Sequence, residues 1–446
     1  MKNKTIFSKD FIFIIIGQII SIFGNQILRY ALPLYLLNQT GSSALFGTIS
    51  ASTFIPMLVL FPIGGIIADR FNKKNIMVIL DFSTAILIFL FYVLVGKIDI
   101  VPLIAITMII LYGIQGAYQP AVKASVPVIL ETEYIMKANS LVDMINSIAS
   151  MAGPIIGGVL FSIFGLIPIL LVSIGCFFVA AIIEFFIHIP FEKEKTTGNI
   201  FASGIEDFKE SFSFMFKKQP ILWKISFIFA SSNLFLTSLI LIGLPVIITQ
   251  HLEFAQDTAN ALYGYAQGVV AAGAIIGGLL AGVLSNRLKS KTIPILLIGC
   301  ALSVIIAGVA LQRLSAPMEI YIILLIGCTL LLILHTLFQI QMVTYLQLLT
   351  PKDLIGRIIS CFMCVVMCTS PLGQFIYGFI FEKTGESTYI PFYIGGFIMI
   401  GISIFTRHIF YGIEDSIKEI KWFRKIHIIH EKIKVIFEIF KYWHGW

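Results

Sequence analysis

Long apolar runs alternate with short polar segments along the whole chain. Crossing the roughly 30 Å hydrocarbon core of a bilayer takes about 20 mostly apolar residues in a helix. Twelve runs of that length predict spanning helices near 11–37, 43–68, 75–96, 100–126, 138–164, 166–190, 221–249, 260–285, 292–312, 319–348, 355–381 and 388–411. The first run is too long for a cleaved signal peptide and lacks a small-residue cleavage site. We therefore expect an all-α integral membrane protein with twelve transmembrane helices.

Composition and charge support this interpretation. Hydrophobic residues make up 58% of the 446 and charged residues only 12%, whereas soluble domains carry roughly 25% charged residues. Twenty-six Lys and Arg residues fall in segments on one side of the predicted spans, and three fall on the other. Because basic loops stay cytoplasmic, both termini are expected in the cytoplasm of a multi-pass cell-membrane protein. The net charge of +7 then reflects topology and anionic-lipid contact, with no nucleic-acid partner.

A single long polar interruption at 191–220 separates six predicted spans from six. It divides the chain into an N-terminal bundle at 1–190 and a C-terminal bundle at 221–411. Within the interruption, the apolar spacing at 203–217 predicts an amphipathic helix on the inner membrane surface. The basic tail at 412–446 has the same amphipathic pattern, for which lipid anchoring is expected and a regulatory role is the alternative.

The two halves repeat one another at a constant offset. Four pairs of identical residues are separated by 217 positions, namely Gly65 and Gly282, Arg70 and Arg287, Lys74 and Lys291, and Pro154 and Pro371. They fall in the second and eighth spans and in the fifth and eleventh, which indicates an internal duplication. Six-helix repeats with a binding site between them at the membrane midplane are a transporter architecture.

Two motifs carry a family resemblance. The stretch GIIADRFNKK at 65–74 resembles the signature loop of the major facilitator superfamily, and GPIIGG at 153–158 resembles the fifth-helix motif of its drug antiporters. Segments 117–141 and 350–360 are similar to its macrolide-efflux and siderophore-export branch. The resemblance covers roughly residues 10–411, and it implies two pseudo-symmetric six-helix bundles.

The chain departs from the family pattern at three positions. Asn72 replaces a Gly in the loop, which is mild because Asn tolerates tight turns. Tyr112 stands where the family usually has a buried Arg, which weakens any transfer of proton coupling through that Arg. Asn286 replaces Asp in the second-half copy, so the charges are concentrated in the first loop.

The charged loop is expected to act as a gate. Asp69 can meet the positive N-terminal end of the eleventh helix and pair with Arg357, and by resemblance this contact stabilises the outward-open state. The alternative is that the bases are topology anchors only. The expected gating set is Gly65, Asp69, Arg70, Lys73, Lys74 and Arg357.

Small residues predict close contact between the fifth and eighth spans. Small side chains let membrane helices approach closely, and Pro154 removes a backbone donor and permits a bend. Generic packing unrelated to transport is the alternative. The packing residues are Gly153, Pro154, Gly157 and Gly158 in the fifth span and Gly273 and Gly277 in the eighth, which also carries the pair Gly278 and Gly282.

Polar side chains at membrane depth are the candidates for a substrate cavity, because they are costly there and tend to mark function. Arg29 could instead snorkel to the interface, and His335 could be a neutral histidine that a neighbour satisfies. The cavity candidates are Gln18, Asn25 and Arg29, which share a face of the first span with Ser21, then Tyr112, Gln115 and Gln119 in the fourth, and His335 and Gln339 in the tenth.

Three acidic residues are candidates for proton coupling: Asp81, Asp143 and Glu184. Each lies within roughly 10 Å of the predicted cytoplasmic end of its helix. Structural pairing is the alternative, since Lys123 or Lys137 could neutralise one of them.

No cofactor or metal site is expected. Cys361, Cys364 and Cys368 share one helix face, but no His or Cys cluster completes a ligand set, so apolar packing is favoured. No G-x-x-x-x-G-K-[ST] stretch occurs, which argues against ATP hydrolysis in this chain. A convergent catalytic set is also missing, so the chain is not expected to be an enzyme.

The leading hypothesis is a bacterial drug-resistance type of exporter. It would move amphipathic, macrolide-like molecules by proton antiport and alternating access, as a monomer whose partners are substrate, protons and membrane lipids. A dedicated exporter of one metabolite, such as a siderophore, is the alternative. A membrane sensor or an enzyme on a transporter scaffold is more remote.

The gate hypothesis makes a first prediction. Asp69→Asn keeps the shape of the side chain but removes the charge that meets the helix end, so efflux of a macrolide or a lipophilic cationic dye from energised cells should fall sharply. Efflux that persists with Asp69 neutralised would contradict the assignment.

Overall fold

The computed structural model describes residues 8–189, 212–284, 287–351 and 354–410, and these are almost entirely helical. Within these ranges, twelve helical stretches are long and apolar enough to cross a membrane. The predicted fold class is therefore confirmed, and the predicted span limits agree with the helices to within a few residues. The predicted amphipathic helices of the linker and the tail fall mainly outside the described residues.

The N-terminal half contains six spans, of which the second is divided. Its helices are α1 (Lys9–Thr40), α2 (Ser43–Ser52), α3 (Phe54–Arg70), α4 (Lys73–Leu94), α5 (Ile100–Ile129), α6 (Thr132–Phe164) and α7 (Leu166–Phe185). The second span comprises α2 and α3, which meet at Thr53.

The C-terminal half begins with the short π-helix η1 (Phe214–Lys218) and also contains six spans. The first comprises α9 (Pro220–Ser232), η2 (Asn233–Thr237), α10 (Ser238–Val246) and η3 (Ile247–His251), where η2 and η3 are π-helical. The others are α11 (Gln256–Val283), α12 (Thr292–Arg313), α13 (Pro317–Leu349), α14 (Ile355–Thr384) and α15 (Ile390–Phe410).

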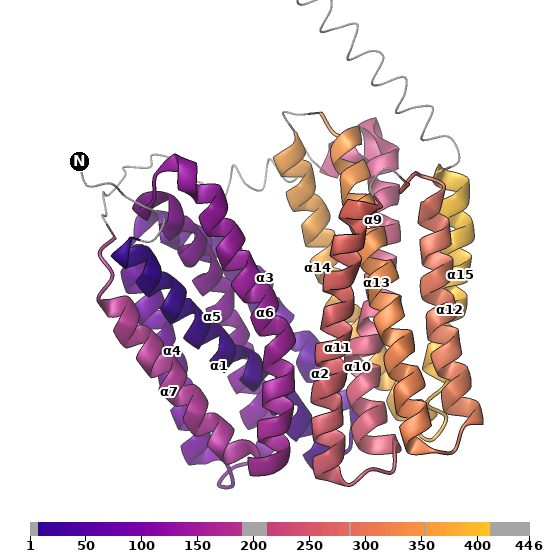
Figure 1. Ribbon diagram of the computed structural model, residues 1–446, viewed down its shortest axis with the longest axis horizontal. Helices are drawn as coiled ribbons and strands as arrows, with labels where there is room; N and C mark the ends of the chain where they lie inside the picture. Colours follow the sequence, from indigo (N-terminus) through magenta and orange to yellow (C-terminus); the bar gives the residue numbers. More distant parts are fainter. Residues whose placement is uncertain (1–7, 190–211, 285–286, 352–353, 411–446) are drawn as a thin grey trace, which may run out of the picture.

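The two halves lie side by side, with α2 reaching across to α14 of the other half (Figure 1). We call the end of the bundle that carries residues 71–72 and 130–131 the inner end, following the predicted orientation, and the opposite end the outer end. The turns at Gly41 and Gly165 lie at the outer end.

Local sequence explains how the chain turns at each end. Gly41 adopts a left-handed φ of 63°, and its N–H donates to Leu37 O to close α1. Ser42 then caps α2, since its hydroxyl accepts from the N–H of Leu45. At the inner end, Asn72 caps α4 through the N–H of Lys74 at 3.0 Å, with a φ of −63°. Asn is accommodated in the loop as a helix cap, so the glycine conformation is not required there.

Glycines bring the backbones of the two halves into direct contact at two places. A Cβ on Gly47 of α2 would lie 2.8 Å from Gly378 Cα of α14, and a Cβ on Gly264 of α11 would lie 2.8 Å from Pro154 O of α6 and 2.9 Å from Gly158 Cα. Gly47 and Gly264 are separated by 217 residues, the offset of the internal duplication. A similar glycine contact is therefore built twice, although the partner glycines Gly378 and Gly158 are 220 positions apart.

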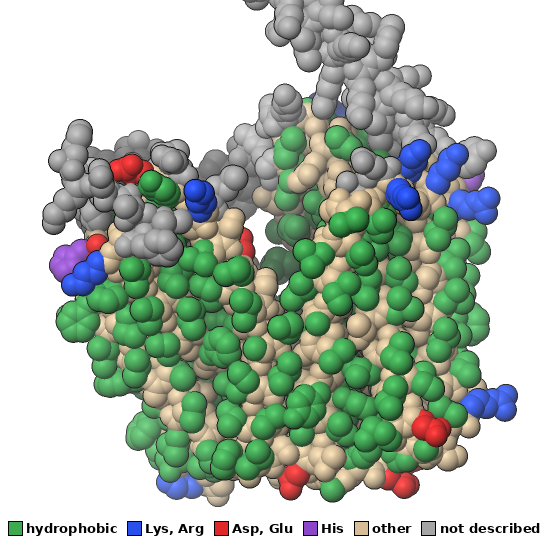
Figure 2. Space-filling model, in the orientation of Figure 1, with side chains coloured by type: hydrophobic (Ala, Val, Ile, Leu, Met, Phe, Trp, Pro, Cys, Tyr) green, Lys and Arg blue, Asp and Glu red, His purple; other side chains and the backbone are tan. Residues whose placement is uncertain are grey.

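Hydrogen bonds between the halves also gather at the outer end. Among the described residues they include Ser43 Oγ to Gly378 O at 3.0 Å, Asn38 Nδ2 to Asn260 Oδ1 at 2.9 Å and Ser162 Oγ to Asp257 O at 2.7 Å. The Tyr30 and Tyr263 rings stack across the same seam. Toward the inner end the surface is hollowed between the halves (Figure 2). The structure is thus closed at its outer end and open at its inner end.

The glycine contact yields a prediction with a control on the same helix. Gly264→Leu places a side chain against the α6 backbone, whereas a Cβ on Gly278 meets nothing within 4 Å. Overpacking costs about 1–3 kcal/mol, so thermal unfolding in detergent should show Gly264→Leu destabilised by about that amount relative to Gly278→Leu. Equal stability of the two variants would mean that the contact is not tight.

Candidate functional site

Two acidic side chains are buried together inside the N-terminal half. Asp81 of α4 and Glu184 of α7 are 2% and 0% exposed. Ser21 Oγ of α1 donates to Asp81 Oδ1 at 2.9 Å, and Tyr118 OH of α5 donates to Glu184 Oε1 at 2.6 Å. Four helices therefore contribute to one polar cluster, which we call the acid cluster.

The α1 backbone makes room for the second acid. A Cβ on Gly17 would lie 3.0 Å from Glu184 Cγ, so a larger residue there would crowd the carboxyl-bearing side chain. Gly17 and Ser21 are four residues apart, and the two acids therefore meet the same face of α1 about 6 Å apart along its axis.

Only one oxygen of each carboxyl in the acid cluster accepts a hydrogen bond. Asp81 Oδ2, Glu184 Oε2 and both amide atoms of Gln18 are buried without a hydrogen-bond partner in the structure. Buried polar atoms are normally paired, and each exception needs an explanation. The second oxygen of each carboxyl can accept a proton.

Asp143, the third acidic candidate, lies in a different environment. It is paired with Lys123 at 3.5 Å, and the side chains of the two residues are 64% and 57% exposed. Of the three acidic candidates, Asp143 is therefore the one that a lysine, Lys123, neutralises, as the alternative of structural pairing expected. It does not share the sealed environment of the other two acids.

The polar face of α1 was expected to look into a central cavity, and the structure corrects this for Gln18 and Asn25. Both are buried within the bundle, where Asn25 Nδ2 donates to Gln115 Oε1 of α5 at 3.2 Å. The reason is that α1 packs against α5, α6 and α7 of its own half, so its polar residues bond inside the bundle.

The remaining candidates of α1 and α5 lie near the same contact. The Arg29 guanidinium lies 4.0 Å from the centre of the Tyr112 ring, a cation–π contact. Gln119 is half-buried, and its Nε2 has no partner in the structure. Arg29 and Tyr112 thus link α1 to α5.

The polar pair of α13 packs within the C-terminal half. His335 is buried, lies 3.0 Å from Ser232 Oγ of α9 and stacks on Phe338. Gln339 Nε2 is 3.5 Å from Asn233 Oδ1 of η2. The neighbours therefore satisfy His335, as in the alternative given above.

The predicted gate is only partly described. Asp69, Arg70 and Arg357 have side chains outside the described set, so their contact stays a prediction. Lys74 Nζ lies 4.7 Å from the Phe185 ring centre, and a Cβ on Gly65 would meet nothing within 4 Å.

The glycine prediction holds for the helices but not for every residue. The fifth and eighth spans, α6 and α11, do touch, through Pro154 and Gly158 on one side and Gly264 on the other. Gly273 and Gly277 instead face Thr329 and Ile333 of α13, and Gly153 and Gly157 face Gln26 and Tyr30 of α1. The correction follows from helix rotation, because residues that lie along different stripes of one helix meet different neighbours.

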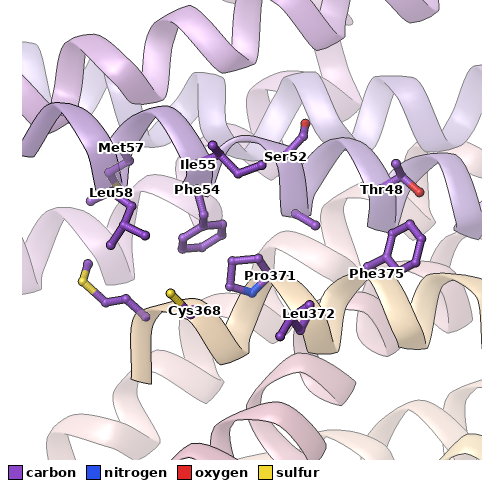
Figure 3. A pocket seen from close by; sticks show the side chains of 12 residues that line it. Thr48, Ser52, Phe54, Ile55, Met57, Leu58, Cys368, Pro371, Leu372 and Phe375 are labelled. Atoms are coloured by element: carbon purple, nitrogen blue, oxygen red, sulfur yellow. The ribbon is translucent and has the colours of Figure 1, made fainter. Parts of the chain in front are cut away.

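An apolar groove lies between α2, α3 and α14, at the seam of the two halves (Figure 3). Its volume is about 460 Å³. The groove extends along α2 and α3 from Thr48, the residue after Gly47, past the junction of the two helices at Thr53. Its lining includes Thr48, Phe54, Leu58, Met367, Cys368 and Pro371. Nothing in the sequence indicated this groove, because its side chains are mainly apolar and cannot be told apart in the sequence from side chains that face lipid.

Comparison with known families gives a consistent result. The family model of the Major Facilitator Superfamily matches residues 14–373. Macrolide efflux protein A of Streptococcus pyogenes is 22% identical over 408 residues, which cover 87% of this chain and 93% of that protein. An uncharacterised MFS-type transporter of Bacillus subtilis, YfiS, is 23% identical over 364 residues, which cover 79% and 81%.

Solved structures agree on the fold. A bacterial homologue of the iron transporter ferroportin, in an inward-facing state, superposes with a TM-score of 0.67 at 15% identity, covering 89% of this chain and 98% of that one. A bacterial homologue of the lysosomal transporter Spinster, also inward-facing, gives 0.65 at 14% identity, covering 91% and 96%.

The groove can be tested by filling it. Cys368→Trp places a large ring among apolar walls, so binding of a lipophilic cationic dye to the purified protein should weaken about tenfold. Met363→Trp is the control, because Met363 is exposed on the same helix and does not line the groove. Fluorescence titration measures both, and equal binding by the two variants would exclude the groove as a binding surface.

Proposed function

The chain belongs to the major facilitator superfamily and is a multi-pass membrane transporter, and on this premise we propose that it exports amphipathic small molecules in exchange for protons. The alternating-access cycle would move the two halves about their contact. In the predicted orientation, the structure is the state that loads substrate from the cytoplasm, because it is closed at the outer end and hollowed at the inner end.

The acid cluster is the observation that supports proton coupling. Two carboxyls are sealed in the bundle, and the ion pairs among the described residues include neither. Keeping two neighbouring carboxylates charged without a cation would be costly there, so the pair is expected to hold a proton in this state. The Tyr118 and Ser21 hydroxyls hold one oxygen of each acid and leave the other free.

The cluster is also placed to respond to movement. Its members come from α1, α4, α5 and α7, and α1 additionally meets the other half through Tyr30, whose hydroxyl donates to Asn260 O. A displacement of α1 during opening at the outer end would change the spacing around Ser21. Such a displacement could admit water and release the proton, which is the coupling that an antiporter needs.

The groove and the relatives support the substrate class. The groove between the halves offers apolar walls to a lipophilic molecule. Similarity to the macrolide efflux protein named above supports a bulky amphipathic substrate and outward transport for this chain. The varied transporters with this fold show that the fold alone does not select a substrate.

Neutralising the buried acids tests the proposal. Asp81→Asn and Glu184→Gln should each lower uphill efflux of a macrolide or a lipophilic cationic dye from energised cells about tenfold or more, since neither amide can carry the proton. Asp143→Asn is the matched control, because its carboxyl is exposed and paired with Lys123. It should retain most of the activity.

A protonophore should abolish efflux by the wild type. Full efflux by both buried-acid variants would refute proton coupling at this cluster. If the wild type moves neither compound, the broad exporter gives way to a carrier dedicated to one metabolite.

A further inference from the structure

One carboxylate spans the outer contact between the two halves. Glu382 lies in the last turn of α14, and its Oε2 accepts hydrogen bonds from Ser42 Oγ at 3.1 Å and from the N–H of Ala44 at 3.1 Å. The Ser43 hydroxyl lies 3.2 Å from the same oxygen and 3.0 Å from Gly378 O. All of these donors belong to the N-terminal end of α2, in the other half of the protein.

The arrangement suits a negative charge. The first N–H groups of a helix have no partner within the helix, and the helix dipole places partial positive charge at this end. Ser42 already caps α2 by accepting from Leu45 N, and its proton is free to go to Glu382. Glu382 thus supplies, from the other half of the protein, an acceptor for the N–H of Ala44 and the hydroxyl of Ser42 at the start of α2.

The glycine contact holds Glu382 in place. Gln374, Gly378 and Glu382 follow at steps of four residues and share one stripe of α14. A Cβ on Gly47 would lie against Gln374 O and Gly378 Cα, so the backbones of α2 and α14 touch one turn away from the carboxylate. This close approach brings the acid within reach of the α2 terminus.

The internal duplication supplies a comparison within the same molecule. In the contact between α6 and α11, Gly158 packs on Gly264 as Gly378 packs on Gly47, although Gly158 and Gly378 are 220 positions apart and so lie about one helical turn off the register of the duplication. Four residues beyond Gly158 stands Ser162. Ser162 Oγ donates to Asp257 O at 2.7 Å, near the N-terminal end of α11. One contact therefore carries a charge on a helix end, and its duplicate carries a neutral hydrogen bond.

We propose that Glu382 is the outer latch of the transporter: its carboxylate, bound to the N-terminal end of α2, holds the outer side closed, and it must leave that end for substrate to be released. This assignment rests on the alternating access proposed above. The latch mirrors the predicted contact of Asp69 with the N-terminal end of α14 at the inner side. Glu382, at the end of α14, would then contact the start of α2, and Asp69, at the end of α3, would contact the start of α14.

Distances across the outer end test the latch without any substrate. Spin labels at Lys97→Cys and Arg313→Cys, two exposed residues at the outer end of opposite halves, would be measured by pulsed electron resonance in nanodiscs, with the six native cysteines replaced. Glu382→Gln keeps the shape but loses the charge. It should raise the ratio of outer-open to outer-closed molecules about fivefold, which corresponds to about 1 kcal/mol.

Two variants serve as controls. Glu382→Asp keeps the charge on a shorter side chain and should shift the distances less than Glu382→Gln does. Ser162→Ala removes the neutral hydrogen bond of the duplicate contact and should leave the distribution close to that of the parent. Efflux in the chain with its native cysteines provides a second readout, in which Glu382→Gln should slow transport.

The outcomes separate the latch from the proposed function. An unchanged distance distribution in Glu382→Gln would overturn the latch, as would an equal shift in Ser162→Ala, because loss of the charge would then have no particular effect. A lower unfolding temperature without a shift in distance would reduce Glu382 to a local cap of α2 and would also refute the latch. A clear shift in distance in a protein that exports neither test compound would uphold the latch and contradict the exporter.

Discussion

The close approach of helix backbones across the outer end is the constraint on which the rest of the structure depends. Lipid tails are as apolar as leucine, so no hydrophobic effect draws two membrane helices together, and contact relies on small residues and hydrogen bonds. Gly47 against Gly378 and Gly264 against Gly158 supply that contact at two places. Because both lie toward one end, the halves can separate at the other, and the hollow at the inner end follows from where the glycines are.

Polar groups inside each half obey a second constraint. An unsatisfied polar atom is expensive where no water can reach it, and polar residues of α1 accordingly find partners on other helices, as Asn25 does with Gln115 of α5. The acid cluster departs from this rule, since one oxygen of each carboxyl is left without a partner in the structure. The Gln18 amide and Gln119 Nε2 are also unpaired there. A group that binds and releases a proton needs such an unfilled position, whereas a purely structural acid would be expected to have its oxygens filled.

The sequence was sufficient for the architecture and insufficient for the partners of individual side chains. The spans follow from hydrophobic length, and the contact between α6 and α11 follows from small residues, because both are properties of a helix as a whole. The partner of a given residue depends on how its helix is rotated, which neighbouring helices decide. Gly273 therefore faces α13 instead of α6, and Gln18 lies inside the bundle instead of in a cavity. The groove at Cys368 is lined by helices from different halves, and its presence depends on how these helices lie against each other, which no local sequence pattern predicts.

The duplication explains why charge is concentrated on one pair of helices. A repeated chain begins with two identical seams, and a symmetric pair of latches at each end would have to break together. Here Asn286 stands where the first loop has Asp69. In the α6–α11 contact, the residue four positions after the packing glycine is Ser162, whereas in the α2–α14 contact it is Glu382. Among the described residues, the contacts of the α6–α11 seam are neutral, whereas Glu382 of α14 brings a carboxylate to the start of α2. The contact of Asp69 with the start of α14 remains a prediction. If the proposed outer latch and the predicted Asp69 contact both operate, the α6–α11 seam would act as the hinge of the proposed rocking motion. The seam between α2–α3 and α14 would then decide which side of the membrane is open.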